Sequence, residues 1–136
     1  MSDFEQIEQI KQLKARYLRY LDTRQWQLWK QVFTEDVITD YGDGKEKKPV
    51  GVGKVIEMTR SVLEGTVSVH HAHTPEITII DDSNAQGIWG MEDIIDAPDY
   101  LLHGYGHYHE DYRKVEGEWR ISRVELRRLK RDVSPK

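Results

Sequence analysis

Three histidines within four residues form the densest group of potentially catalytic side chains in the sequence. In a β-rich segment, strand alternation places His71 and His73 on one face and His70 on the other. A histidine held against a carboxylate is a general base poised near neutral pH. The run therefore indicates proton transfer. Two other interpretations remain open. His71 and His73 could form a His-x-His metal site, which would need a third ligand, or the histidines could be polar strand residues that bind no ligand.

Two aspartates could serve as the partner of such a histidine. Asp22 follows a helical apolar stripe that ends near Leu21, where the helix macrodipole opposes a negative charge and favours a compensating contact. The competing interpretation makes Asp22 the N-cap of the next helix. Asp93 shares a strand face with Trp89 and Met91, which would carry its carboxylate inward. In the alternative interpretation, Asp93 lies near the rim and forms an ion pair with an arginine.

The elements that must position these residues are helices in the first half of the chain and strands in the second. Ser2 and Glu5 can form a capping box before an amphipathic helix that runs to about Leu21. A short second helix carries Trp26 and Trp29. A short strand over 37–41 and a third helix over 55–63 are expected next.

Four long strands are expected over 66–80, 85–95, 101–115 and 118–130. The short turns between them are typical of antiparallel neighbours, and the glycines at 104 and 106 indicate a bulge that curves the sheet. The pattern predicts an α+β fold in which a curved, mostly antiparallel sheet wraps around the N-terminal helices. A ligand pocket is expected in the cleft between them. Residues 1–132 are expected to form a single domain, followed by a disordered tail at 133–136.

The composition is that of an ordinary soluble globular domain, with 38% hydrophobic and 32% charged residues in a chain of 136. A net charge of −4 favours neither nucleic acid nor membrane as a partner, and the C-terminal arginines lack the interleaved exposed aromatics of a nucleic-acid surface. No apolar run approaches the roughly 20 residues of a membrane span. The absence of cysteine and an acidic, polar N-terminus suggest a cytoplasmic protein.

Four segments together resemble one known family. They are 7–26 (IEQIKQLKARYLRYLDTRQW), 70–77 (HHAHTPEI), 87–93 (GIWGMED) and 104–121 (GYGHYHEDYRKVEGEWRI). They are similar to the SnoaL-like branch of the nuclear-transport-factor-two-like superfamily, whose members include bile-acid dehydratases, scytalone dehydratase and hexachlorocyclohexane dehydrochlorinase. The resemblance spans nearly the whole chain and implies the cone-shaped, cystatin-like barrel of that superfamily.

The resemblance also implies a catalytic His–Asp pair. Tyr17 and Asp22 match a Tyr-x4-Asp pattern that ends the first helix of the bile-acid dehydratases. Their catalytic histidine lies three residues before a His-Thr-Pro-Glu-Ile segment, which here begins at His73, so His70 is the match. Alignment with the dehydrochlorinase strand leaves His71 as the alternative. Asp22 would then orient the imidazole, as the carboxylate does in a His–Asp dyad.

Further site residues follow from the same resemblance. Asp93 matches the acidic residue of a Trp-x-x-Glu-Asp run, and Arg128 matches an arginine near the end of the last strand. Together with Tyr17, Asp22 and His70 they form the expected catalytic set. The residues expected to contact the substrate are Tyr41, His71, His73, Trp89 and Met91.

The implied activity is a cofactor-independent lyase or isomerase of the dehydratase type. The histidine would remove a proton from a hydrophobic polycyclic or aromatic small molecule, which requires no metal and no organic cofactor. A noncatalytic ligand-binding or dimerisation module of the same fold is the alternative. The small subunit of an aromatic-ring dioxygenase shares the fold as well. The resemblance further implies a homodimer formed through the outer face of the sheet.

Overall fold

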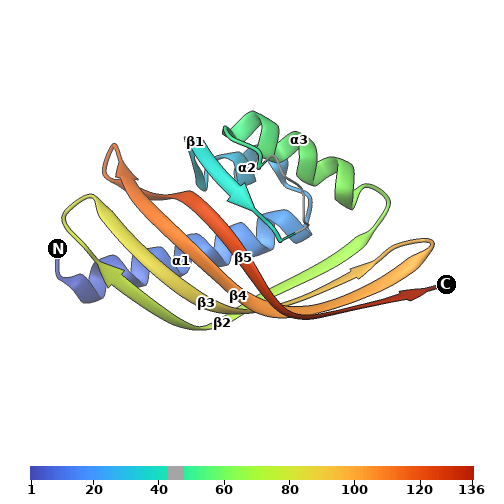
Figure 1. Ribbon diagram of the computed structural model, residues 1–136. Helices are drawn as coiled ribbons and strands as arrows, with labels where there is room; N and C mark the ends of the chain where they lie inside the picture. The colour runs from blue at the N-terminus through green and yellow to red at the C-terminus, as the bar shows by residue number, and fades with distance from the viewer. Residues whose placement is uncertain (43–47) are drawn as a thin grey trace.

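A curved five-stranded sheet wraps around a long helix (Figure 1). The structure, a computed structural model, describes residues 1–42 and 48–136. The helices are α1 (Asp3–Asp22), α2 (Trp26–Lys30) and α3 (Val52–Leu63). The strands are β1 (Phe33–Asp40), β2 (Val67–Ile79), β3 (Asn84–Asp96), β4 (Tyr100–Val115) and β5 (Glu118–Pro135). Within the described residues, no helix combines the length and apolarity needed to cross a membrane.

The strands lie in the order β1-β5-β4-β3-β2, and the last four form the expected antiparallel meander. The predicted α+β fold is therefore confirmed. Strand β1 adds a parallel neighbour to β5, with Thr39 opposite Val124. The sequence predicted this strand only over 37–41. It begins at Phe33 instead, because the Ile121 amide donates to the Val32 carbonyl and holds the chain against β5 from that point.

Helix α1 lies across the concave face of the sheet and supplies one wall of the core (Figure 1). The predicted capping box is present: the Ser2 hydroxyl accepts from the Glu5 amide, and the Glu5 carboxylate accepts from the Ser2 amide. The apolar stripe of the helix, including Ile10 and Leu13, is buried against the strands. This orientation brings the C-terminal end of α1 close to β2.

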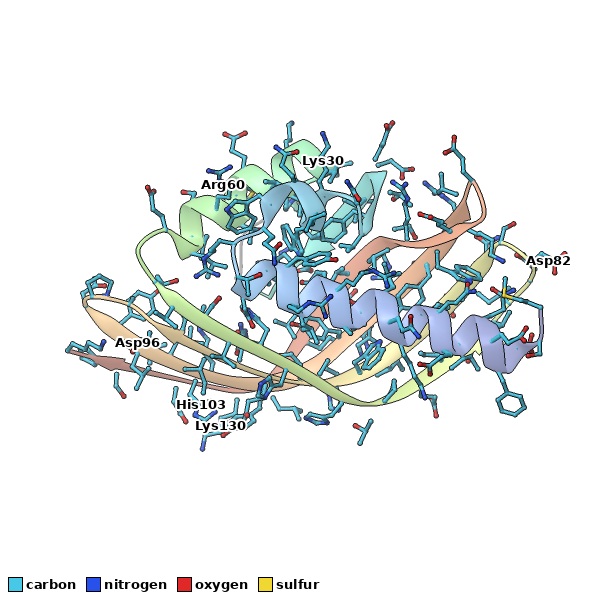
Figure 2. The ribbon with its side chains drawn as sticks, turned by 180° about the vertical axis from the view of Figure 1, so that it is seen from behind. Lys30, Arg60, Asp82, Asp96, His103 and Lys130 are labelled. Atoms are coloured by element: carbon cyan, nitrogen blue, oxygen red, sulfur yellow. The ribbon has the colours of Figure 1, made fainter. Side chains whose placement is uncertain are left out.

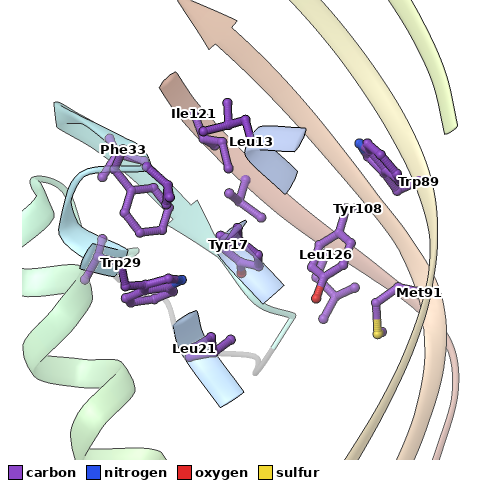
Figure 3. Packing of buried hydrophobic residues seen from close by; sticks show 14 of the residues in the cluster. Leu13, Tyr17, Leu21, Trp29, Phe33, Trp89, Met91, Tyr108, Ile121 and Leu126 are labelled. Atoms are coloured by element: carbon purple, nitrogen blue, oxygen red, sulfur yellow. The ribbon is translucent and has the colours of Figure 1, made fainter. Parts of the chain in front are cut away.

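Aromatic rings fill the space between α1, α2 and β1 (Figure 3). The Trp29 ring lies 4.8 Å from that of Phe33 and 5.6 Å from that of Tyr17, measured between centroids. Tilted and edge-on contacts of this kind stabilise a core beyond the burial of apolar surface alone. The cluster fixes the position of Tyr17, whose hydroxyl is one of the candidate catalytic groups.

Strand β5 continues almost to the end of the chain. The expectation of a disordered tail at 133–136 is wrong, since Val133 pairs with Leu102 of β4. The Lys136 amide also donates to the Asp99 carbonyl, at 3.0 Å. The composition of the tail could not indicate this, because its order comes from a neighbouring strand rather than from its own residues.

Two glycines of β4 lie where the sheet bends. The β4–β5 register shifts between Tyr105 and Gly106, which agrees with the predicted bulge. A Cβ atom at Gly106 would lie 2.2 Å from the backbone oxygen of Arg127. A Cβ atom at Gly104 would lie 2.2 Å from an Arg128 side-chain nitrogen. The missing side chains thus allow β5 and the Arg128 side chain to pass close to β4.

A fully buried ion pair joins α1 to the middle of the sheet. The ammonium group of Lys14 lies 2.6 Å from the Glu110 carboxylate, and both side chains are inaccessible to solvent. Glu110 also accepts from the Tyr112 hydroxyl, at 2.7 Å. Lys14 lies over the ring of Tyr17, 3.8 Å from its centroid, and over that of Tyr108, at 3.5 Å. Burial lowers the pKa of Lys14, while Glu110 opposes this shift.

The close packing at Gly106 predicts that alanine destabilises the protein at this position but not at an open glycine position. Gly106→Ala should lower the free energy of unfolding by about 1–3 kcal/mol, because backbone atoms must move to admit the methyl group. Gly53→Ala is the matched control: it lies in α3 with nothing within 4 Å of its Cβ position, and should stabilise by about 0.5–1 kcal/mol. Urea unfolding followed by tryptophan fluorescence measures both. Equal effects would contradict this account of the bulge.

The buried ion pair predicts that single and double substitutions behave differently. Lys14→Met or Glu110→Ala alone should lower the free energy of unfolding by about 3–5 kcal/mol, because each leaves a buried charge without its partner. The double variant Lys14→Met with Glu110→Gln should recover most of that loss, since no charge remains and the amide can still accept from Tyr112. Thermal and urea unfolding would test this. A double variant less stable than both singles would refute it.

Candidate active site

A cavity of about 230 Å³ lies between the C-terminal half of α1, helix α3 and the concave face of the sheet. Most of its wall is apolar, as expected for a pocket that binds a small hydrophobic molecule. The apolar residues that line it are Leu21, Pro49, Met58, Val62, Leu63, Ile95, Leu102 and Leu126. Polar side chains of the inner wall that could take part in a reaction include Tyr17, Tyr41, His70, Asp93, Tyr108 and Arg128. Other polar and charged side chains also line the cavity: Thr39, Asp40, Lys48, Thr59, Tyr100 and Arg131.

Asp22 and His70 form a hydrogen-bonded pair beside this cavity. The carboxylate of Asp22 lies 2.7 Å from the ring nitrogen Nδ1 of His70. It also accepts from the His70 amide, at 2.7 Å, and from the Ser68 hydroxyl, at 2.9 Å. These three contacts compensate a carboxylate at the negative end of a helix dipole. The N-cap interpretation of Asp22 is wrong, because Gln25 takes the N-cap position of α2.

The pairing sets the protonation pattern of the His70 ring. A carboxylate can only accept, so the proton of the neutral imidazole lies on Nδ1. The other nitrogen, Nε2, is then left with an unshared electron pair. Because His70 lines the cavity, Nε2 is available to take a proton from a molecule bound there.

Asp93 and Arg128 form a second pair in the same cavity wall. The guanidinium donates through both terminal nitrogens to the two carboxylate oxygens, at 3.1 and 3.0 Å. Asp93 is buried, and it lies directly opposite His70 in the β2–β3 register. The pair passes over Gly104, where a Cβ atom would lie 2.3 Å from an Asp93 oxygen. Both sequence interpretations of Asp93 thus hold in part, since it points inward and is also bound to an arginine.

Three tyrosines of the cavity wall, Tyr17, Tyr41 and Tyr108, are buried or half-buried. The hydroxyls of Tyr17 and Tyr41 lie 2.9 Å apart. The hydroxyl of Tyr108 makes no hydrogen bond with the described residues, although its side chain is buried beside Tyr17 (Figure 3). Burial raises the pKa of Tyr17, Tyr41 and Tyr108 well above the ordinary tyrosine value. All three hydroxyls therefore stay protonated and can donate hydrogen bonds over the physiological pH range.

Four residues expected to contact the substrate lie elsewhere. His71 and His73 are exposed on the outer face of β2, because alternation turns them away from the face that carries His70. Trp89 and Met91 point inward, as predicted, but into the core beneath α1 rather than into the cavity (Figure 3). This placement corrects their assignment to substrate binding.

The structure adds residues that the sequence reasoning missed. Tyr108 belongs to the site, and its signal was the alternation with Gly104 and Gly106, which places all three on the concave face. Ser68 belongs to it through its bond to Asp22, with no sequence signal beyond its position two residues before His70. Within residues 1–42 and 48–136, no group of three or more potential ligands is arranged to hold a metal ion.

Solved structures of several proteins share this fold. A scytalone dehydratase candidate from Novosphingobium aromaticivorans is 21% identical, with a TM-score of 0.84 over 96% of this chain and 88% of that one. An aromatic-ring hydroxylase candidate from the same species is 19% identical, with a TM-score of 0.87 over 100% and 96%. A type 2 hexachlorocyclohexane dehydrochlorinase is 15% identical, with a TM-score of 0.84 over 99% and 93%. At these identities the likeness shows a common fold.

A family model provides the assignment that the structures alone do not. The model of the SnoaL-like domain matches residues 2–125, from the start of α1 into β5. The matched range includes Asp22, His70 and Asp93, whereas Arg128 lies just beyond it. Since the match covers most of the chain and agrees with the fold, this protein belongs to the SnoaL-like domain family.

Proposed function

We propose that this protein is a cofactor-independent lyase or isomerase that removes a proton from a hydrophobic small molecule. The observation that carries the proposal is the contact between Asp22 and the Nδ1 atom of His70, at 2.7 Å, beside an apolar cavity. A binding module gains nothing from a histidine whose second nitrogen is oriented as a base. The SnoaL-like family and its dehydratase-like structural neighbours support the same class of reaction.

In the proposed reaction, Nε2 of His70 accepts a proton from a carbon atom of the substrate. The electron pair of the broken C–H bond forms a new double bond, and the imidazole becomes positively charged. The carboxylate of Asp22, 2.7 Å from Nδ1 and largely buried with it, stabilises that charge. In an elimination, the bond between carbon and the leaving group breaks, the leaving group departs with that electron pair, and the imidazolium then gives its proton to the leaving group. In an isomerisation, the proton returns to another carbon of the substrate.

The tyrosines are suited to stabilise an oxygen atom that gains negative charge. Tyr17 and Tyr41 hydrogen-bond to one another, so one of the two hydroxyl protons remains available to a ligand. Tyr108 offers a further hydroxyl from β4, next to Tyr17. Hydrogen bonds to a leaving hydroxyl, or to an enolate oxygen, lower the barrier most when the donors are already oriented. This favours substrates that carry an oxygen near the acidic C–H bond.

Asp93 and Arg128 are proposed to shape and polarise the cavity rather than to transfer the proton. Their bidentate contact pairs the two charges and holds the guanidinium against Asp93, which lies opposite His70 in the β2–β3 register. A largely apolar wall disfavours charged molecules that lack a partner within the cavity. The substrate is therefore proposed to be a hydrophobic aromatic or polycyclic compound.

We further propose that two copies associate through the outer face of the sheet. That face carries His103 and Lys130, on the side of the strands away from α1 (Figure 2). It also exposes Val67 and Val69 on β2, at 67% and 38% of their surface. Exposed apolar side chains on a face of this kind are typical of association surfaces.

The dyad predicts a sharp difference between neighbouring histidines. A panel of hydrophobic β-hydroxy ketones, followed by the ultraviolet absorbance of the alkene product, provides the assay. His70→Ala and Asp22→Asn should lower kcat/KM by about 10²–10⁴ fold while the circular dichroism spectrum stays unchanged. His71→Ala is the matched control and should keep the wild-type rate, because its side chain lies on the other face of β2. Full activity of His70→Ala would exclude the proposed base.

If two copies associate, analytical ultracentrifugation at micromolar concentration should detect a particle with twice the mass of one chain, which is 16.0 kDa. Val69→Lys should shift the particle toward 16.0 kDa, because a charge would be buried in the interface. Val50→Lys, which alters an exposed valine on another part of the molecule, should have no effect. A wild-type protein that sediments as a monomer would disprove the association.

A further inference from the structure

Arg24 occupies a backbone conformation that arginine rarely adopts. Its φ angle is 58°, in the left-handed region that favours glycine. The Gln25 amide donates to the Tyr20 carbonyl at 2.8 Å, and the Arg24 amide to the Leu21 carbonyl at 3.1 Å. These are the two bonds of a Schellman motif that ends α1, with Arg24 at the position usually held by glycine or asparagine. Glycine or asparagine would suit this backbone conformation better, so the role of Arg24 lies in the contacts of its side chain.

The guanidinium of Arg24 makes four hydrogen bonds next to the Asp22–His70 pair. One terminal nitrogen donates to the Leu21 carbonyl at 2.9 Å and to the Ser68 hydroxyl at 2.7 Å. The other donates to the carbonyl and the hydroxyl of Thr66, at 3.0 and 3.2 Å. The side chain therefore joins the end of α1 to Thr66, just before β2, and to Ser68 within it.

These contacts fix the direction of the Ser68 hydroxyl. A guanidinium has no acceptor, so Ser68 must accept from Arg24 and can direct its single proton only elsewhere. That proton goes to the Oδ1 atom of Asp22, at 2.9 Å. The same oxygen lies 2.7 Å from Nδ1 of His70. Because Ser68 cannot turn away, it holds the Asp22 carboxylate in the orientation in which Oδ1 accepts from the His70 ring.

We propose that Arg24 is a positioning residue that acts through Ser68 and Asp22 to keep His70 protonated at Nδ1, with Nε2 facing the cavity as a base. The inference rests on the proposed function for its catalytic meaning. The hydrogen-bond chain itself is a property of the free protein, so it can be tested without a substrate. It also explains why an arginine occupies a left-handed position where glycine or asparagine would be less strained.

The test observes the His70 ring directly. In protein labelled with ¹⁵N-histidine, ring nitrogen shifts report the tautomer, and exchange with water reports how firmly the Nδ1 proton is held. Arg24→Gly and Arg24→Asn both suit the left-handed backbone and remove the guanidinium. Each should speed exchange of the Nδ1 proton about tenfold and populate the Nε2-protonated form. Ser68→Ala should have the same effect.

Thr66→Val is the matched control. It removes one Arg24 contact that does not lead to Asp22, and should leave the His70 tautomer and exchange unchanged. Wild-type exchange in both Arg24 variants would overturn the proposal, as would a His70 ring protonated at Nε2 in the unaltered protein. Should the Arg24 variants fail to fold, Ser68→Ala decides, because it keeps the three other guanidinium contacts.

Turnover is measured separately on the same variants. A changed tautomer together with a kcat about tenfold lower, at unchanged KM, supports both the positioning role and the proposed base. A changed tautomer without any detectable activity in the unaltered protein refutes the proposed function alone. A lower kcat with a wild-type tautomer refutes the positioning role alone.

Discussion

The packing of α1 against β2 and the orientation of the candidate base both depend on the hydrogen bonds of the Asp22 carboxylate. Asp22 ends α1, where the helix dipole disfavours a negative charge, and its carboxylate is stabilised by donors from β2. One of those donors is the backbone amide of His70, and another is its ring. The contact that joins the helix to the edge of the sheet is therefore also the contact that orients the candidate base. Any shift of α1 against β2 would alter both at once.

The second constraint is the curvature of the sheet. The strands must bend far enough to place a helix and a cavity on the same concave face, and the bulge beside Gly106 provides part of that bend. Gly104 leaves room for Arg128 to reach Asp93 across β4. The missing side chains at these two positions therefore serve the site as well as the fold.

Two ion pairs lie on the inner side of the sheet, and the tyrosine hydroxyl groups beside them stay neutral. Lys14 is bound to Glu110, and Asp93 to Arg128, so each of these buried charges is compensated in surroundings of low polarity. Burial keeps Tyr17 protonated. In such surroundings, protonation of the His70 imidazole would create an isolated charge unless a carboxylate were already in contact with the ring. Asp22 meets that requirement before any ligand arrives.

The sequence by itself determined the helices and strands, because the capping box, apolar periodicity and turn residues act over a few positions. It placed the helix that ends near Asp22, the long strands and the opposite faces of His70 and His71. The local pattern could not choose between a cap and a dyad for Asp22, because the partner lies 48 residues away, and the dyad was expected only from the resemblance of four segments to a known family. The contact between Lys14 and Glu110 spans 96 residues and left no local trace. Only the tertiary structure decided these contacts, since they depend on how far the sheet bends and on which residues then meet across it.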